Sequence, residues 1–105
     1  MLPAYRDICL PLLLEIAKRG GKTRPQEKRN GTTVYESLAI YFSLTRQDLA
    51  AEVNEPGAGK RNKWENMVRW ARKDLVDWGY IDNSQRGIWR LTEKGLKAAA
   101  EKRID

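Results

Sequence analysis

Apolar residues near the start of the chain recur at the three- and four-residue spacing of an α-helix. They are Tyr5, Ile8, Cys9, Leu12, Leu13 and Ile16. This spacing predicts one helix that begins at about Pro3 and ends at Gly20 and Gly21. Pro11 lies inside the pattern and has no backbone N–H group, so we expect a kink or an early turn near Asp7.

Two threonine caps predict the next two helical segments. Thr32 or Thr33 can cap a helix with Glu36 placed for a capping box. The apolar stripe of that helix is Val34, Leu38, Ala39 and Phe42. Thr45, followed three residues later by Asp48, caps a shorter segment that ends at the turn-forming sequence NEPGAG, residues 54–59. In this short segment we expect three residues to face inward, namely Leu49, Ala50 and Val53.

The longest amphipathic pattern predicts a helix from Arg61 to Trp78. Its apolar positions follow the spacing of a buried face and are Trp64, Met67, Val68, Ala71, Leu75 and Trp78. Gly79 follows in the position that a left-handed helix cap requires. The opposite face of this helix then presents Asn62, Lys63, Asn66, Arg69, Trp70, Lys73 and Asp77.

After Gly79 the pattern changes from helical to alternating. Tyr80 and Ile81 predict a short strand, residues 82–87 (DNSQRG) a turn, and residues 88–91 a returning strand. Thr92 then caps a last helix that ends at about Lys102. We therefore predict a single domain over residues 1–105 that is mainly α with a small β-hairpin. Its elements are three to four helices, a two-stranded wing and a C-terminal helix. This is the order of elements in a winged helix-turn-helix.

The composition excludes several classes of function. The chain has 105 residues, no histidine and a single cysteine, Cys9, so a Cys/His zinc site, a histidine general base and an intramolecular disulfide have no residues to form them. We therefore expect no enzymatic activity, no metal and no cofactor. Apolar stretches such as residues 8–14 are far shorter than the roughly 20 residues that span a bilayer, and we expect a soluble, cytoplasmic protein without a membrane partner.

The positive charge is concentrated in two segments, residues 18–29 and 60–73. Each holds six lysines and arginines and one glutamate, whereas the whole chain has a net charge of only +6. The rest of the chain is therefore net negative, which is typical of a protein with one face toward a polyanion; a merely solvated surface is the alternative. Most of the first segment lies in residues 20–31, which we expect to form a mobile basic loop with nothing to bury.

The outward face of the predicted 61–78 helix suits the major groove of DNA. Asparagine can pair with adenine and arginine with guanine, so Asn66 and Arg69 are the predicted base readers. Trp70 borders this face, where it either closes a pocket around a methylated base edge or packs against the hairpin. The other predicted contacts are mostly to phosphate, from the helix and the tip of the hairpin. The complete predicted DNA-binding set is Lys60, Arg61, Asn62, Lys63, Asn66, Arg69, Trp70, Lys73, Gln85 and Arg86.

Residues 66–80 (NMVRWARKDLVDWGY) and 85–95 (QRGIWRLTEKG) carry a resemblance to a known family. They resemble the N-terminal winged-helix domain of Mrr-type restriction endonucleases. In that family a helix with Asn, Trp-Ala, Leu and a terminal Gly leads into a wing of the form Arg-Gly-x-Trp-x-Leu-Thr-x-x-Gly. The matching positions are Asn66, Trp70, Ala71, Leu75, Gly79, Arg86, Gly87, Trp89, Leu91, Thr92 and Gly95.

The resemblance implies that this domain is the target-recognition part of a longer protein in a prokaryote or virus. Such a domain selects double-stranded DNA, methylated or not, while a separate nuclease domain cuts it. Two alternatives remain: a free-standing winged-helix transcriptional regulator, and a winged helix whose basic face binds an acidic protein. A regulator of this type usually has a dimerisation helix. The last predicted helix is short and offers few apolar residues, so we expect a monomer.

Overall fold

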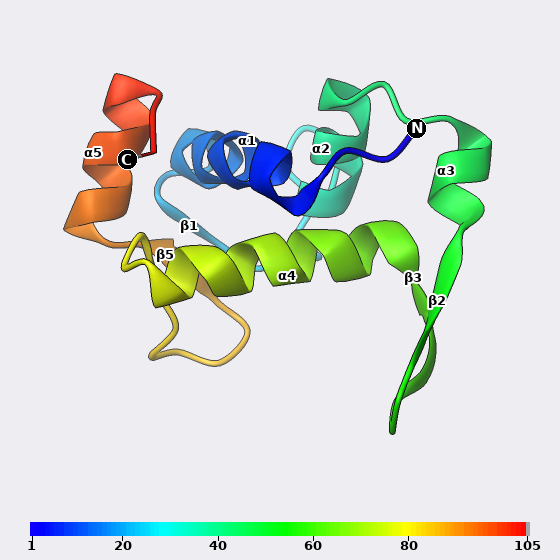
Figure 1. Ribbon diagram of the computed structural model, residues 1–105. Coiled ribbons are helices and arrows are strands. Elements are labelled where there is room, and N and C mark those ends of the chain that lie inside the picture. The colour runs from blue at the N-terminus through cyan, green and yellow to red at the C-terminus, as the bar shows by residue number, and fades with distance from the viewer. Residues whose placement is uncertain (105) are drawn as a thin grey trace.

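Helices α1 (Tyr5–Lys18) and α4 (Lys63–Asp77) pack against each other and carry half of the buried apolar residues (Figure 1). The computed structural model describes residues 1–104, over which there are five helices and two small antiparallel sheets. The remaining elements are β1 (Lys22–Thr23), α2 (Val34–Tyr41), α3 (Arg46–Ala50), β2 (Glu52–Glu55), β3 (Gly59–Asn62), β4 (Ile81–Asp82), β5 (Trp89–Leu91) and α5 (Glu93–Glu101). The prediction of a small, helix-rich domain is confirmed.

Most residues of the apolar stripes predicted for α1, α2 and α4 lie in the core, together with residues of β4, β5 and α5. Tyr5, at the start of the predicted α1 stripe, is instead 45% exposed. On α4 the buried residues are Trp64, Met67, Val68, Ala71 and Leu75. The Trp64 indole N–H donates to the Tyr35 carbonyl at 2.9 Å, which satisfies the one polar group of this large buried side chain. Trp78, which was also predicted to face the core, is instead 47% exposed. It lies at the C-cap of α4, next to an open hollow lined by Arg6, Leu10 and Ile104, so one side of the indole meets solvent.

The predicted helix caps are confirmed. The Thr33 and Thr45 hydroxyls accept hydrogen bonds from the N–H groups of Glu36 and Asp48, and both carboxylates bond back to form capping boxes. The Thr92 hydroxyl accepts from the Gly95 N–H at the start of α5. At the end of α4, Gly79 has φ +86° and Tyr80 donates to the Leu75 carbonyl at 2.8 Å, as in a Schellman cap.

Helix α1 runs without interruption from Tyr5 to Lys18, although Pro11 lies inside it. The predicted early turn near Asp7 is wrong, because the helix is already formed there, and the kink that was the other alternative stays a prediction. Pro11 leaves only the Asp7 carbonyl without its helical donor, and the apolar face on both sides of it is buried in the same core.

The segment between α3 and α4 differs from the prediction. Leu49 and Ala50 of α3 are exposed, so the inward face predicted for them is wrong. Val53, predicted to share that face, lies instead in β2, where it is half-buried. A helix of five residues outside the core has no apolar layer to pack against. Residues 54–59 do not simply end the helix: they include the end of β2, the turn at residues 56–58 and the start of β3. In this hairpin β2 pairs with β3, and Val53 lies opposite Arg61.

The predicted hairpin after α4 is confirmed as β4 and β5, but it is part of a three-stranded sheet with the order β1-β5-β4. Strand β1 comes from residues 20–31, where a loop with nothing to bury was expected. That expectation is wrong, since Thr23 is 4% exposed and lies opposite Trp89 in the register. Backbone pairing depends little on side-chain type, so a polar segment can complete a sheet edge. The mobility of residues 20–31 stays a prediction.

Candidate nucleic-acid interface

The outward face of α4 forms the floor of a groove between two projections. The β2–β3 hairpin and the β4–β5 loop both extend past α4 on the side away from α1 (Figure 1). An open hollow of about 460 Å³ lies on this face. It is lined by Glu55, Arg61, Asn66, Arg69, Trp70, Arg72, Lys73, Val76, Asp77 and Asn83. The hollow therefore gathers five of the predicted DNA-binding residues, which are Arg61, Asn66, Arg69, Trp70 and Lys73.

Two cations of α4 are paired with carboxylates along the helix surface. The Arg69 guanidinium lies 3.5 Å from the Glu65 carboxylate, and the Lys73 amine lies 3.0 Å from that of Asp77. Exposed i,i+4 pairs of this kind contribute only about 0.3–0.5 kcal/mol. Arg69 and Lys73 can therefore exchange these partners for a phosphate or a base edge at little cost.

Two arginines of α4 lie over aromatic rings of the core. The Arg69 guanidinium lies 5.7 Å from the Tyr35 ring centroid, and that of Arg72 lies 5.8 Å from the Trp89 ring centroid. The Arg72 Nε is buried, and it has no hydrogen-bond partner within residues 1–104. Arg72 is absent from the predicted DNA-binding set because it adjoins the core stripe of α4. Its position in the basic segment 60–73 was the one feature of the sequence that pointed to a role in DNA binding.

The start of α4 differs from the prediction in a way that changes three of the predicted contacts. The helix begins at Lys63, so Lys60 and Arg61 lie in β3 and not at the helix start. Arg61 forms an ion pair with Glu55 across the hairpin. Asn62 is the N-cap: its side chain accepts from the Glu65 N–H at 3.0 Å and donates to the Leu49 carbonyl at 2.8 Å. The prediction that Asn62 lies on the outward face of the helix is therefore wrong.

The β4–β5 loop carries the predicted residues Gln85 and Arg86, both exposed. The Gln85 side-chain oxygen accepts a hydrogen bond from Arg90 at 2.7 Å. Asp82 holds the loop, because its carboxylate accepts a hydrogen bond from the Ser84 N–H at 2.8 Å. The Asp82 pKa is lowered by this bond, by the Ser84 hydroxyl and by the Arg90 charge. Five predicted residues do not line the hollow, namely Lys60, Asn62, Lys63, Gln85 and Arg86.

The family model described as the Mrr N-terminal domain matches residues 5–101, which run from the start of α1 to the end of α5. The chain belongs to the Mrr N-terminal domain family. The match associates it with Mrr-type restriction enzymes, through their N-terminal domain and not through the nuclease domain. Searches of curated proteins and of solved structures found no match.

Most residues of the Mrr motif are explained by the fold itself. Ala71 and Leu75 are fully buried, and Gly95 packs so closely that an added Cβ would lie 2.1 Å from the Tyr80 carbonyl oxygen. Gly79 and Gly87 have positive φ. The structure assigns no such packing role to three of the motif residues, since Asn66 and Trp70 line the hollow and Arg86 is exposed on the β4–β5 loop.

Other kinds of site have no counterpart in the part of this Mrr domain that the structure describes. Residues 1–104 contain no group of three or more His, Cys, Asp or Glu side chains that could hold a metal ion. Cys9 is buried, which raises its pKa to about 11 and keeps the thiol protonated near neutral pH. No helix within residues 1–104 is long and apolar enough to cross a membrane.

Proposed function

We propose that this domain is a winged-helix DNA-recognition module of an Mrr-type restriction enzyme, in which α4 is the recognition helix. The observation that carries the proposal is the gathering of cationic and amide side chains on the outward face of α4, between two projecting loops. An α-helix fits the major groove of B-DNA, and loops at its two ends can then reach the flanking backbone.

The order of the elements supports the winged-helix assignment. The first helix is followed by a short strand, further helices and a hairpin, and that short strand pairs with the second strand of the hairpin. In this arrangement α4 would be the recognition helix and the β4–β5 loop would be the wing. The insertion of α3 and the β2–β3 hairpin before α4 adds the second wall of the groove.

Within the groove we assign base reading to Asn66 and Arg69 and phosphate contacts to Arg72 and Lys73. The amide of Asn66 matches the adenine edge and the guanidinium of Arg69 matches guanine. Trp70, which is 45% exposed, presents an apolar surface beside them against which the methyl group of a modified base could pack. The domain selects the DNA, and cutting belongs to another part of the enzyme.

The first experiment is a set of binding titrations followed by fluorescence anisotropy. Matched unmodified, adenine-methylated and cytosine-modified duplexes are compared at two salt concentrations. We expect an affinity that falls steeply with salt, because several phosphates are contacted, and a preference among the three duplexes. Equal affinity for all three would refute recognition of modified bases. The absence of binding to any duplex at low salt would refute the proposed function.

Two variants separate base reading from phosphate binding. Arg69→Ala should weaken binding to the preferred duplex by about 1–3 kcal/mol and reduce the preference, whereas Lys73→Ala should weaken binding to all duplexes alike. Lys97→Ala, on the outside of α5, is the control that removes a charge away from the groove. If Arg69→Ala and Lys73→Ala both bind as the Lys97→Ala control does, α4 is not the reading element.

A further inference from the structure

The outer face of the three-stranded sheet carries a second group of cations. Thr23 and Trp89 point into the core, so their strand neighbours Lys22 and Arg90 point to the opposite face. Arg24, which directly follows β1, is exposed. In the register Lys22 lies directly opposite Arg90 on the neighbouring strand. Like charges in this arrangement repel each other and destabilise a sheet.

No carboxylate within residues 1–104 forms an ion pair with these three cations. Asp82 lies opposite Arg90 on its other side, but both of its oxygens accept hydrogen bonds from Ser84, at 2.8 and 3.0 Å. Arg90 itself donates to the neutral side chain of Gln85. Arg90 is compensated in part by its attraction to Asp82, whose pKa it lowers. Lys22 has no such partner among residues 1–104, and a bound anion would relieve its repulsion with Arg90.

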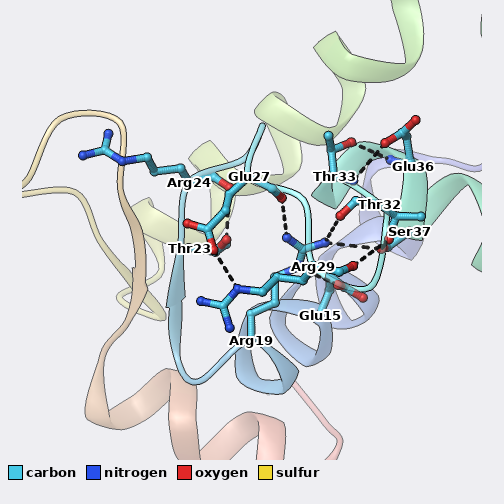
Figure 2. Close-up of polar contacts among 10 residues, drawn as sticks. All are labelled: Glu15, Arg19, Thr23, Arg24, Glu27, Arg29, Thr32, Thr33, Glu36 and Ser37. Atoms are coloured by element: carbon cyan, nitrogen blue, oxygen red, sulfur yellow. Dashed lines mark hydrogen bonds and ion pairs between the residues drawn. The ribbon is translucent and has the colours of Figure 1, made fainter.

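Arg24 connects this face to the β4–β5 loop. Its Nη1 lies 3.4 Å from the position that a Cβ on Gly87 would occupy, which means that the guanidinium packs against the loop backbone. Figure 2 shows the Arg24 side chain extending toward that loop, away from the polar network around Arg19. Arg86 is the neighbour of Gly87, so the cationic surface continues onto the tip of the loop.

The four remaining cations of the basic segment 18–29 have other environments. Lys18 lies exposed in the last turn of α1. Arg19 is buried and bonds to backbone carbonyls. Arg29 pairs with Glu27 at 2.6 Å. Lys28 lies in the field of Glu36, whose pKa it helps to lower. The segment therefore divides into a part that holds the loop in place and a part, Lys22 and Arg24, that is directed to the sheet face.

We propose that Lys22, Arg24, Arg86 and Arg90 form a second phosphate-binding surface for the same duplex that occupies the α4 groove. The two surfaces are joined by the β4–β5 loop, since Asn83 of that loop lines the hollow on α4. DNA seated on α4 therefore passes beside the loop, and its backbone continues onto the sheet face. This inference rests on the proposed DNA binding by α4.

The test compares two double variants that remove the same charge. Lys22→Gln with Arg24→Gln changes the sheet face, and Lys28→Gln with Lys97→Gln changes exposed residues elsewhere. The first should bind every duplex about tenfold more weakly and lower the slope of log affinity against log salt by about 1.8, since each phosphate contact contributes roughly 0.9. The second should keep a slope close to that of the parent, and neither should change the order of preference among duplexes.

Folding is checked for both variants by circular dichroism and by thermal melting. The first should melt at or above the temperature of the parent, because a repulsive pair has been removed. If its salt slope equals that of the Lys28/Lys97 control while Arg69→Ala still loses base preference, the sheet face does not bind DNA and the α4 proposal stands. If the parent binds no duplex, both proposals fail together.

Discussion

Replacement of Arg19 by methionine tests how the polar segment between α1 and α2 is held in place. Arg19 is only 4% exposed at the C-cap of α1. Its Nε donates to Glu15 at 2.7 Å, Nη1 to the Glu27 carbonyl at 2.7 Å and Nη2 to the Thr32 carbonyl at 2.8 Å. The segment that carries β1 passes beside the side chains of this network (Figure 2).

Methionine retains most of the side-chain volume but none of the donors. Hydrogen bonds from a charged group contribute about 1.5–3 kcal/mol each, and removing one partner of a buried ion pair costs about 3–5 kcal/mol because the other charge is left unpaired. Glu15 is itself only 13% exposed and would lose its partner. We therefore expect Arg19→Met to lower the free energy of unfolding by about 3–5 kcal/mol, a large share of the roughly 5–15 kcal/mol that is typical of folded domains.

Urea denaturation followed by tryptophan fluorescence measures this difference. The matched control is Arg29→Met, which removes the same group from an ion pair with Glu27 in which both side chains are 40% or more exposed. Such a pair contributes about 0–1 kcal/mol. A loss for Arg19→Met no larger than that for Arg29→Met would show that the buried network does not stabilise the fold.

Three further predictions concern close packing, cross-strand charge and pH. Gly95→Ala should destabilise the domain by about 1–3 kcal/mol in thermal melting, in spite of the higher helix propensity of alanine, because the new Cβ would lie 2.1 Å from the Tyr80 carbonyl oxygen; a gain in stability would contradict the packing at this site. Lys22→Glu should raise the free energy of unfolding by about 0.2–1 kcal/mol, because it places a negative charge opposite Arg90, and it should weaken DNA binding. A lower melting temperature would contradict the pairing of Lys22 with Arg90. Hydrogen bonds lower the pKa of several carboxyls in the folded state. The ionised carboxylates therefore stabilise the fold fully when the pH is above the ordinary pKa values of 3.8 for Asp and 4.5 for Glu, and this stabilisation is lost as the pH falls below those values. They are Glu27, Glu36, Asp48 and Asp82. Urea midpoints measured between pH 6 and pH 2.5 should fall with acidification, and a constant midpoint would refute this assignment.

The candidate site was predicted in part because most of it lies on one helix. Asn66, Arg69, Trp70 and Lys73 share the outward face of α4, and their spacing follows once the apolar stripe is recognised. The roles of Asn62 and Arg61 were misjudged because the helix begins two residues later than its charge pattern indicates. A hairpin of alternating polar residues has no apolar face, so β2 and β3 left no periodic signal.

The sequence by itself determined the features that depend on residues within a few positions of one another. The threonine caps, the buried stripe of α4 and the left-handed turn at Gly79 are of this kind, because their partners are three to five residues away. Only the tertiary structure decided the pairing of β1 with β5, the burial of Arg19 and the exposure of Trp78. Each of these depends on whether a distant segment supplies a strand edge, a set of carbonyl oxygens or a covering layer, and such partners come together only when the whole chain has folded.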